Sequence, residues 1–148
     1  MLAYLSFGSE FHTDAFAAAV LAQDKRLVLP RVNSAHRRLE LFAVADLALD
    51  VAPGVWGIRE PRLDRCATAT AGQIGLILAP GVAFSPRCER LGYGGGFYDR
   101  LLSQWPARRP PVVAAAFSLQ IVDVLPIGPS DVPVDLVVTE DAVYKRPT

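Results

Sequence analysis

The residues with the clearest chemical potential surround a cluster of glycines in the middle of the chain. Arg90 precedes the cluster and Asp99 follows it, and the glycines between them are Gly92, Gly94, Gly95 and Gly96. An apolar run at residues 74–79 leads into this stretch, and a helix pattern at residues 97–105 leads out of it. Backbone N–H groups of such a loop, together with the helix N-terminus, can bind a phosphate. Arg90 could donate paired hydrogen bonds to the phosphate, and Asp99 could hold a Mg²⁺ that bridges phosphates.

A flexible surface loop without a ligand is the second interpretation of this stretch, because glycine clusters usually have that role. Consecutive glycines lose much conformational entropy when they become ordered, so an ordered glycine-rich turn usually serves a function. The neighbouring rings of Tyr93, Phe97 and Tyr98 also favour an ordered loop, since exposed apolar rings are unfavourable in water. The spacing matches neither a Walker A loop, because no Gly-Lys-Ser/Thr follows, nor a dinucleotide-binding fingerprint. The residues favour an anion site and leave the flexible loop as the alternative.

Length and composition predict a single folded domain that comprises residues 1–148. Of the 148 residues, 51% are hydrophobic and 20% are charged, which is typical of a globular protein. Fifteen basic and fifteen acidic residues give no net charge, which argues against a nucleic-acid partner. Two cysteines cannot build a disulfide framework, and no apolar run is long enough to span a membrane or to act as a signal peptide. We therefore expect a cytoplasmic protein without a membrane partner, and the sequence does not predict its oligomeric state.

Alternating strand and helix patterns predict an α/β fold. A helix is expected over residues 13–23, because Thr13 is a suitable N-cap and Asp14 interacts favourably with the helix dipole. A second helix is expected over residues 97–105, and a helical turn over residues 119–124. Prolines and glycines predict a loop over residues 50–65. The expected strands comprise residues 2–7, 26–30, 39–44, 74–79, 112–117 and 135–139. This order predicts a three-layer-like sandwich with a mainly parallel sheet and a glycine-rich phosphate loop.

Three further residues could contact a ligand, and each has a simpler structural interpretation. Glu10 follows the first expected strand, where a solvated carboxylate near a helix start is the simpler interpretation. Trp56 lies among glycines and prolines, where it could be core or offer a flat surface to a ring. Asp135 lies between Val134 and Leu136 at a strand start, where a buried carboxylate would need a cation but an edge residue would not.

Simpler interpretations also exist for the other polar residues. Arg100 could form a salt bridge with Asp99, in place of a metal ion. The histidines and cysteines lack the spacing of zinc ligands, and no catalytic triad is identifiable.

The run RLGYGGGFYDR at residues 90–100, preceded by APGVAF and followed by PVDLVVTE, resembles the signature of the 5-formyltetrahydrofolate cyclo-ligase (5,10-methenyltetrahydrofolate synthetase) family. The blocks YLSFGSEFHT, LVLPRV and VWGIREP also resemble family blocks and occur in the family's order, so the resemblance covers nearly the whole chain. It implies conversion of 5-formyltetrahydrofolate to 5,10-methenyltetrahydrofolate with ATP and Mg²⁺. No dedicated general base is evident in the sequence.

The resemblance also implies roles for individual residues of this chain. Asp99 and Asp135 match the family's Mg²⁺ ligands. The reduced folate substrate is matched by Leu5, Glu10, Trp56, Tyr93, Gly94, Gly95, Gly96 and Phe97. The residues that match the ATP-binding block are Arg90, Leu91, Gly92, Tyr93, Gly94, Gly95, Gly96, Phe97 and Tyr98.

The sequence departs from the family pattern at several positions. Met1 lies directly before the YLSF block, where the family has a helix with a Lys-x-x-Leu-Arg motif that completes the ATP site, so this sequence is expected to lack that helix. Two explanations stay open: the true start lies upstream, or the chain is a shortened variant with impaired nucleotide binding. Ser85 and Cys88 stand where the family usually has Asp and Gly, and Phe97 replaces a Tyr. The alternatives to an active cyclo-ligase are a non-catalytic or impaired folate- or nucleotide-binding relative, and a paralogue with a different substrate.

Overall fold

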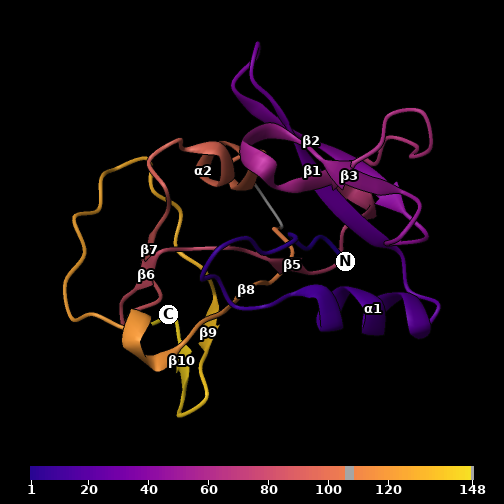
Figure 1. Ribbon diagram of the computed structural model, residues 1–148. Helices are drawn as coiled ribbons and strands as arrows, with labels where there is room; N and C mark the ends of the chain where they lie inside the picture. Colours follow the sequence, from indigo (N-terminus) through magenta and orange to yellow (C-terminus); the bar gives the residue numbers. More distant parts are fainter. Residues whose placement is uncertain (106–108, 148) are drawn as a thin grey trace. The chain divides into compact units, whose positions relative to one another are not determined.

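The computed structural model describes residues 1–105 and 109–147 and has a mixed α/β fold (Figure 1). The chain divides into two compact units, Met1–Gly75 and Leu76–Thr148. Among the described residues, no helix is both long and apolar enough to cross a membrane. The single domain expected from length is therefore still a prediction, and the two units are described separately.

The first unit is built around one helix and two antiparallel strand pairs. In the longer pair, β1 (Leu27–Asn33) runs antiparallel to β2 (Arg38–Val44), with Leu27 opposite Val44. The shorter pair consists of β3 (Val51–Pro53) and β4 (Arg59–Pro61), and the 3₁₀ turn η1 (Val55–Gly57) connects them. The remaining elements are α1 (Asp14–Ala22) and the 3₁₀ turn η2 (Ala71–Gln73). The core of this unit includes Leu2, Ala17, Val20, Leu27, Val28, Leu29 and Phe42.

The second unit contains a four-stranded sheet with the order β10-β9-β8-β5. Its strands are β5 (Ile77–Leu78), β8 (Val112–Ala115), β9 (Leu136–Val138) and β10 (Val143–Lys145). A short antiparallel pair, β6 (Ala83–Phe84) and β7 (Arg90–Leu91), leads into the glycine stretch. The helix α2 (Phe97–Leu102) follows that stretch, and the 3₁₀ turn η3 (Ser118–Gln120) follows β8. Fully buried side chains of this unit include Ile77, Phe84, Leu101, Leu102, Val112, Val134 and Val137.

The structure confirms both predicted helices and corrects several strands. The helix predicted for residues 13–23 spans Asp14–Ala22, and the one predicted for residues 97–105 ends at Leu102. Residues 2–7 do not form a strand, because only Leu2 makes a bridge, to Val28. The strand predicted for residues 74–79 is reduced to Ile77–Leu78. The loop predicted for residues 50–65 contains β3 and β4, and β10 was not predicted.

The sheet of the second unit contains the parallel strand pairs of the described residues. There, β5 pairs with β8 and β8 pairs with β9 in parallel, whereas β9 and β10 are antiparallel. The prediction of a mainly parallel sheet holds for this sheet, and the hairpin of the first unit is an antiparallel addition. The three-layer arrangement remains a prediction.

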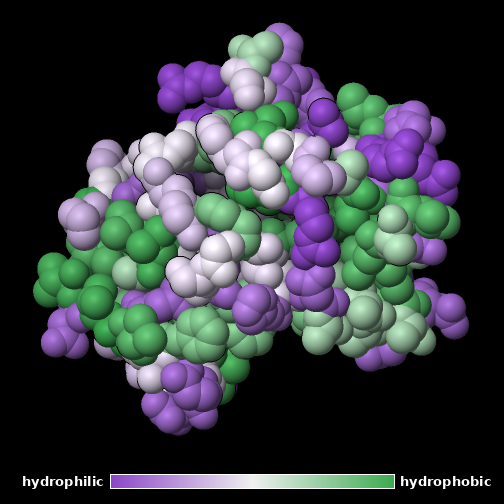
Figure 2. All heavy atoms as spheres, in the orientation of Figure 1, coloured by the Kyte–Doolittle hydropathy of each residue, from purple (hydrophilic) through white to green (hydrophobic). Residues whose placement is uncertain are grey.

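Apolar side chains are exposed in the segment that follows β8. Four of them are Leu119, Val122, Val124 and Ile127, and Leu119 is 82% exposed. Figure 2 shows apolar and polar side chains side by side on the visible face of the molecule. Most of the surface of a folded protein is contributed by apolar atoms, so single exposed apolar residues need no special explanation.

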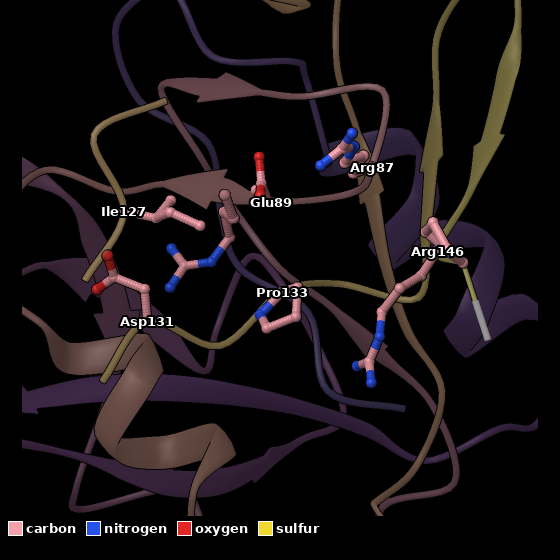
Figure 3. A pocket seen from close by; sticks show the side chains of 8 residues that line it. Arg87, Glu89, Ile127, Asp131, Pro133 and Arg146 are labelled. Carbon is pink, nitrogen blue, oxygen red and sulfur yellow. The ribbon is translucent and has the colours of Figure 1, made fainter. Parts of the chain in front are cut away.

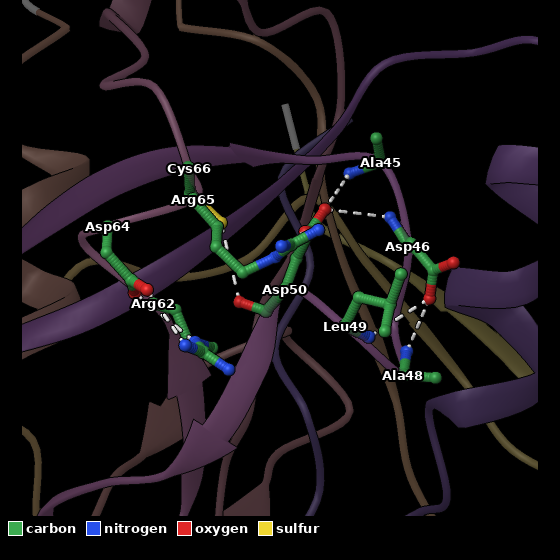
Figure 4. A network of polar contacts seen from close by, with 9 residues as sticks. All are labelled: Ala45, Asp46, Ala48, Leu49, Asp50, Arg62, Asp64, Arg65 and Cys66. Carbon is green, nitrogen blue, oxygen red and sulfur yellow. Dashed lines mark hydrogen bonds and ion pairs between the residues drawn. The ribbon is translucent and has the colours of Figure 1, made fainter.

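A carboxylate network stabilises the chain between β2 and β3 (Figure 4). Asp50 is 7% exposed, and its Oδ2 accepts hydrogen bonds from the backbone N–H groups of Ala45 and Asp46, at 3.0 and 2.9 Å. Its Oδ1 accepts a hydrogen bond from Arg65 Nε at 3.0 Å. The hydrogen bond from Ala45, followed by those from Asp46 and Arg65, lowers the pKa of Asp50, although burial opposes this shift. Cys66 donates to the Asp50 carbonyl, and burial raises the pKa of its thiol.

We predict that Asp50 makes stability dependent on pH. Since the pKa of Asp50 is lower in the folded than in the unfolded chain, its contribution is present above the ordinary aspartate pKa of about 4 and is lost as the pH falls below it. Asp50→Asn should lower the free energy of unfolding at neutral pH by about 2 kcal/mol and flatten its fall in acid. Urea denaturation across the acid range measures both. Asp64→Asn is the control, because Asp64 is exposed; equal effects of the two substitutions would contradict the prediction.

Candidate functional site

The glycine stretch forms a turn whose backbone requires glycine at two positions. Gly94 has φ +83° and Gly96 has φ +63°, which are left-handed conformations that other residues rarely adopt. Gly96 occupies the N-cap position of α2, a helix of only six residues. Arg100 donates a hydrogen bond to the Gly95 carbonyl at 2.7 Å and lies 5.2 Å from the centre of the Phe97 ring. These contacts hold the turn in one conformation, which the anion site predicted from the sequence requires.

An ion pair joins the residues that flank the glycine stretch. Arg90 Nη2 lies 2.6 Å from Asp99 Oδ1, and the Arg90 side chain is only 3% exposed. Arg90 also donates through Nη1 to the Pro80 carbonyl, and its guanidinium lies 5.8 Å from the centre of the Tyr98 ring. Asp99 therefore forms a salt bridge, as the simpler interpretation predicted, but its partner is Arg90 and not Arg100.

The described residues hold Asp99 through one of its two oxygens. Its Oδ1 accepts hydrogen bonds from Arg90 and from the backbone N–H of Val132, at 2.6 and 3.1 Å. Within residues 1–105 and 109–147, no donor is bonded to Oδ2. The side chain is 18% exposed, so this second oxygen is the one that could bind a cation.

Asp135 is more fully engaged than Asp99. Its Oδ1 lies 2.6 Å from Arg109 Nη2 and 3.6 Å from Arg146 Nη1, and its Oδ2 accepts from the backbone N–H of Val112 at 2.8 Å. The side chain is 36% exposed. The sequence predicted Arg109 as solvated surface and not as the partner of Asp135, because a partner so distant along the chain leaves no spacing signal.

The carboxylates of Asp99 and Asp135 do not suit a magnesium site built from protein ligands alone, but one of them suits a site that phosphate oxygens and water complete. No cluster of three or more His, Cys, Asp or Glu side chains suited to a metal ion occurs in the described part of the chain. Mg²⁺ bound to nucleotides usually takes only one or two carboxylates, with phosphate oxygens and water as its other ligands. The accessible Oδ2 of Asp99 fits that arrangement, whereas both oxygens of Asp135 already accept hydrogen bonds.

A pocket of about 560 Å³ in the second unit borders Arg90 (Figure 3). Its charged lining consists of Arg87, Glu89, Arg90, Asp131 and Arg146, and its other lining residues are Ile127, Pro133 and Pro147. The Nε of Arg90 is buried and has no hydrogen-bond partner among the described residues. Three arginines, donors that suit an anionic group, line the pocket beside two carboxylates, and two of the arginines, Arg90 and Arg146, also pair with Asp99 and Asp135.

Ser85 and Cys88 shape the turn that precedes β7. The buried Ser85 hydroxyl accepts hydrogen bonds from the N–H groups of Arg87 and Glu89, both at 3.2 Å, as an aspartate carboxylate at this position could. Cys88 has φ +65°, a conformation that favours glycine. Its thiol is within hydrogen-bond reach of the Tyr144 carbonyl at 3.4 Å, and burial raises its pKa. The first departure from the family pattern thus keeps the hydrogen bonds, and the second introduces backbone strain.

Three of the residues predicted to contact the folate, Leu5, Glu10 and Trp56, lie in the first unit, and of these only Trp56 is exposed. Leu5 is 4% exposed and Glu10 is 7% exposed, with Glu10 Oε2 accepting a hydrogen bond from the Phe7 N–H at 3.0 Å. The structure therefore contradicts the interpretation of Glu10 as a solvated carboxylate. Trp56, in η1, is 70% exposed and has φ +58°. An exposed tryptophan in a strained backbone conformation is not an ordinary core residue, and such strain often accompanies function.

We predict that the ion pair beneath the glycine turn contributes strongly to stability. Arg90→Met keeps much of the side-chain volume but leaves Asp99 with only the Val132 N–H, so it should lower the free energy of unfolding by about 3 kcal/mol. Urea denaturation measures the loss. Arg62→Met is the matched control, because the Arg62–Asp64 pair is exposed on both sides and should contribute little. A loss no larger than that of the control would contradict the role of the pair.

Comparison with known proteins identifies the family. The model of the 5-formyltetrahydrofolate cyclo-ligase family matches residues 1–140. A probable 5-formyltetrahydrofolate cyclo-ligase of Caenorhabditis elegans is 35% identical over 145 residues, with 93% of this chain and 70% of the relative covered. The 5-formyltetrahydrofolate cyclo-ligase of Escherichia coli strain K12 is 31% identical over 142 residues, with 96% and 78% covered.

A solved structure agrees with the sequence matches. The NMR structure of Aquifex aeolicus 5,10-methenyltetrahydrofolate synthetase aligns with a TM-score of 0.80 and 32% identity, covering 97% of this chain and 70% of that chain. A synthetase from Mycoplasma pneumoniae aligns with a TM-score of 0.68 and 28% identity, covering 92% and 70%. The chain therefore belongs to the 5-formyltetrahydrofolate cyclo-ligase family.

Proposed function

We propose that this chain catalyses the ATP- and Mg²⁺-dependent cyclisation of 5-formyltetrahydrofolate to 5,10-methenyltetrahydrofolate, with release of ADP and phosphate. The observation that carries the proposal is the family match over residues 1–140, together with relatives of that activity at 31% and 35% identity. A cytoplasmic location is part of the proposal.

The proposed reaction replaces a poor leaving group with a good one. The formyl oxygen accepts the terminal phosphoryl group of ATP, and N10 of the folate then attacks the activated carbon. The carbon–oxygen bond breaks, phosphate leaves with the former formyl oxygen, and the N10 proton is released. No side chain of this chain needs to act as nucleophile, so its role is to position the reactants and to stabilise charge.

In the second unit we assign the glycine turn to the nucleotide. Its backbone N–H groups, from Leu91 to Tyr98, would face the phosphates, and Asp99 would hold the metal ion through Oδ2. A bound Mg²⁺ would neutralise charge on the phosphate oxygens. Arg90 is bonded to Asp99, so we assign its charge to the edge of the phosphate site, where it also borders the pocket of Figure 3. Asp135 would bind the metal ion only if the ion displaced one of the groups that now donate a hydrogen bond to this carboxylate.

In the first unit we assign Trp56, Leu5 and Glu10 to the reduced folate. The exposed indole of Trp56 offers a flat apolar surface of the kind on which a pterin ring stacks. Leu5 and Glu10 are buried, so they would contact the folate from the wall of its site and not from a mobile surface.

We expect Asp99→Ala to abolish ATP-dependent turnover. The substitution removes a carboxylate beside the glycine turn whose Oδ2 has no bonded donor among the described residues. The assay follows the near-ultraviolet absorbance of the methenyl product after 5-formyltetrahydrofolate and Mg-ATP are mixed. Asp123→Ala, in an exposed loop of the same unit, is the control and should leave turnover unchanged. Normal turnover by Asp99→Ala would contradict the metal role; a wild-type chain that binds folate without turnover would favour the non-catalytic alternative.

Trp56 gives a second test, because its functional and structural roles predict different outcomes. Trp56→Gly relieves the backbone strain at φ +58° and should leave the thermal midpoint close to that of the wild type. Loss of ring stacking should raise the KM for 5-formyltetrahydrofolate by about tenfold, whereas Trp56→Phe should raise it less. Leu63→Ala, at another exposed apolar residue of this unit, is the control. A large drop in stability with an unchanged KM would mean that Trp56 is a structural residue.

A further inference from the structure

The threonine at the start of α1 makes hydrogen bonds that do not cap its own helix. Thr13 occupies the N-cap position of α1, but its side chain makes no capping hydrogen bond. An N-cap threonine usually accepts a hydrogen bond from the first turn of its helix, which stabilises that helix. Here the hydroxyl has two other partners: Oγ1 donates to the Tyr4 carbonyl at 2.6 Å and accepts from the Ser6 N–H at 3.0 Å. Thr13 is fully buried, at 0% exposure.

The two partners of the Thr13 hydroxyl are the residues on either side of Leu5. A third hydrogen bond of Thr13 joins it to Ser6 in the opposite direction, because Ser6 Oγ accepts from the Thr13 N–H at 3.3 Å. Together these bonds close the base of the segment from Ser6 to His12.

Glu10 is held inside the same closed segment. Its Oε2 accepts from the Phe7 N–H at 3.0 Å, and its own N–H donates to the Phe7 carbonyl at 3.3 Å. The segment has no helix or strand, and Gly8 within it has φ +58°. Its conformation therefore depends on these few side-chain bonds, and Thr13 makes three of them.

We propose that Thr13 is a positioning residue for folate binding, which acts through Leu5 and Glu10. The inference rests on the proposed function, since it is that function which assigns Leu5 and Glu10 to the folate. The buried Thr13 hydroxyl donates to the Tyr4 carbonyl and accepts from the Ser6 N–H. It therefore fixes the direction of the two peptide groups on either side of Leu5. Preorganised binding residues lose less entropy when the ligand binds, so loosening the segment weakens binding even when no ligand contact is removed.

The test compares Thr13→Val with Thr13→Ser. Thr13→Val keeps the shape of the side chain and removes the hydroxyl, so the KM and Kd for 5-formyltetrahydrofolate should rise by about tenfold. The KM for ATP should stay within about twofold of the wild-type value, since the Thr13 hydroxyl bonds to Tyr4 and Ser6 and to no described residue of the glycine turn. Thr13→Ser keeps the hydroxyl, so it should bind folate with nearly the wild-type affinity, although it also removes a buried methyl group. Hydrogen exchange of the Ser6 amide should accelerate in Thr13→Val only.

Thr139→Val is the matched control. The Thr139 hydroxyl also has several backbone partners, namely the Ala142 carbonyl and the N–H groups of Asp141 and Ala142, but it lies in the second unit. This variant should lose stability without a change in folate KM. If Thr13→Val does not fold, Ser6→Ala removes the acceptor of the Thr13 N–H and should raise the folate KM by about threefold.

The outcomes separate the inference from the function on which it rests. A wild-type chain that neither binds nor converts 5-formyltetrahydrofolate would overturn both. A wild-type chain with normal turnover, combined with unchanged folate KM in Thr13→Val and Ser6→Ala, would overturn the inference alone. Equal losses of folate affinity in Thr13→Val and Thr13→Ser would also overturn it, because the hydroxyl would then not be the cause.

Discussion

The ion pair between Arg90 and Asp99 is the interaction on which the glycine turn depends. These residues stand at the two ends of the turn, so their contact at 2.6 Å closes it as a small loop. Glycines at left-handed positions lower the strain of such a closed loop but contribute no side-chain packing. Without a fixed closure, the entropy of these glycines would favour an open, mobile segment. A partly buried charge pair supplies that closure, and breaking one side leaves an uncompensated charge.

The same pair determines what the turn can bind. Both Arg90 and the Val132 N–H hold a single oxygen of Asp99, so the other oxygen keeps its direction and its access to a cation. Arg90 is itself buried and borders a pocket with two more exposed arginines. The chain therefore provides one oriented carboxylate oxygen whose partner Arg90 borders a pocket with further arginines, and a magnesium-bound polyphosphate requires both kinds of group. The backbone of Cys88 has a conformation that favours glycine, which shows that the turn before β7 tolerates some strain.

Local signals in the sequence predicted the helices and the glycine turn, but not the partners of the charged residues. Thr13 and Asp14 mark the start of α1, and the glycines mark the turn before α2. The apolar run at residues 2–7 looks like a strand, but only Leu2 bridges β1, and the backbone at Tyr4 and Ser6 bonds to the Thr13 side chain. Sequence proximity suggested Arg100 as the partner of Asp99, whereas tertiary packing brings Arg90 there. The short strands β3, β4 and β10 have too few residues for a periodic pattern.

The central claim is that this chain activates a formyl oxygen by transferring a phosphoryl group from ATP to it. The most direct measurement uses 5-formyltetrahydrofolate whose formyl oxygen carries the heavy isotope oxygen-18, with Mg-ATP in ordinary water. If the claim is correct, the label appears in the inorganic phosphate in proportion to the methenyl product formed, because the formyl carbon–oxygen bond breaks after the oxygen has bonded to phosphorus. Methenyl product accompanied by unlabelled phosphate, with the heavy oxygen released as water, would contradict the claim.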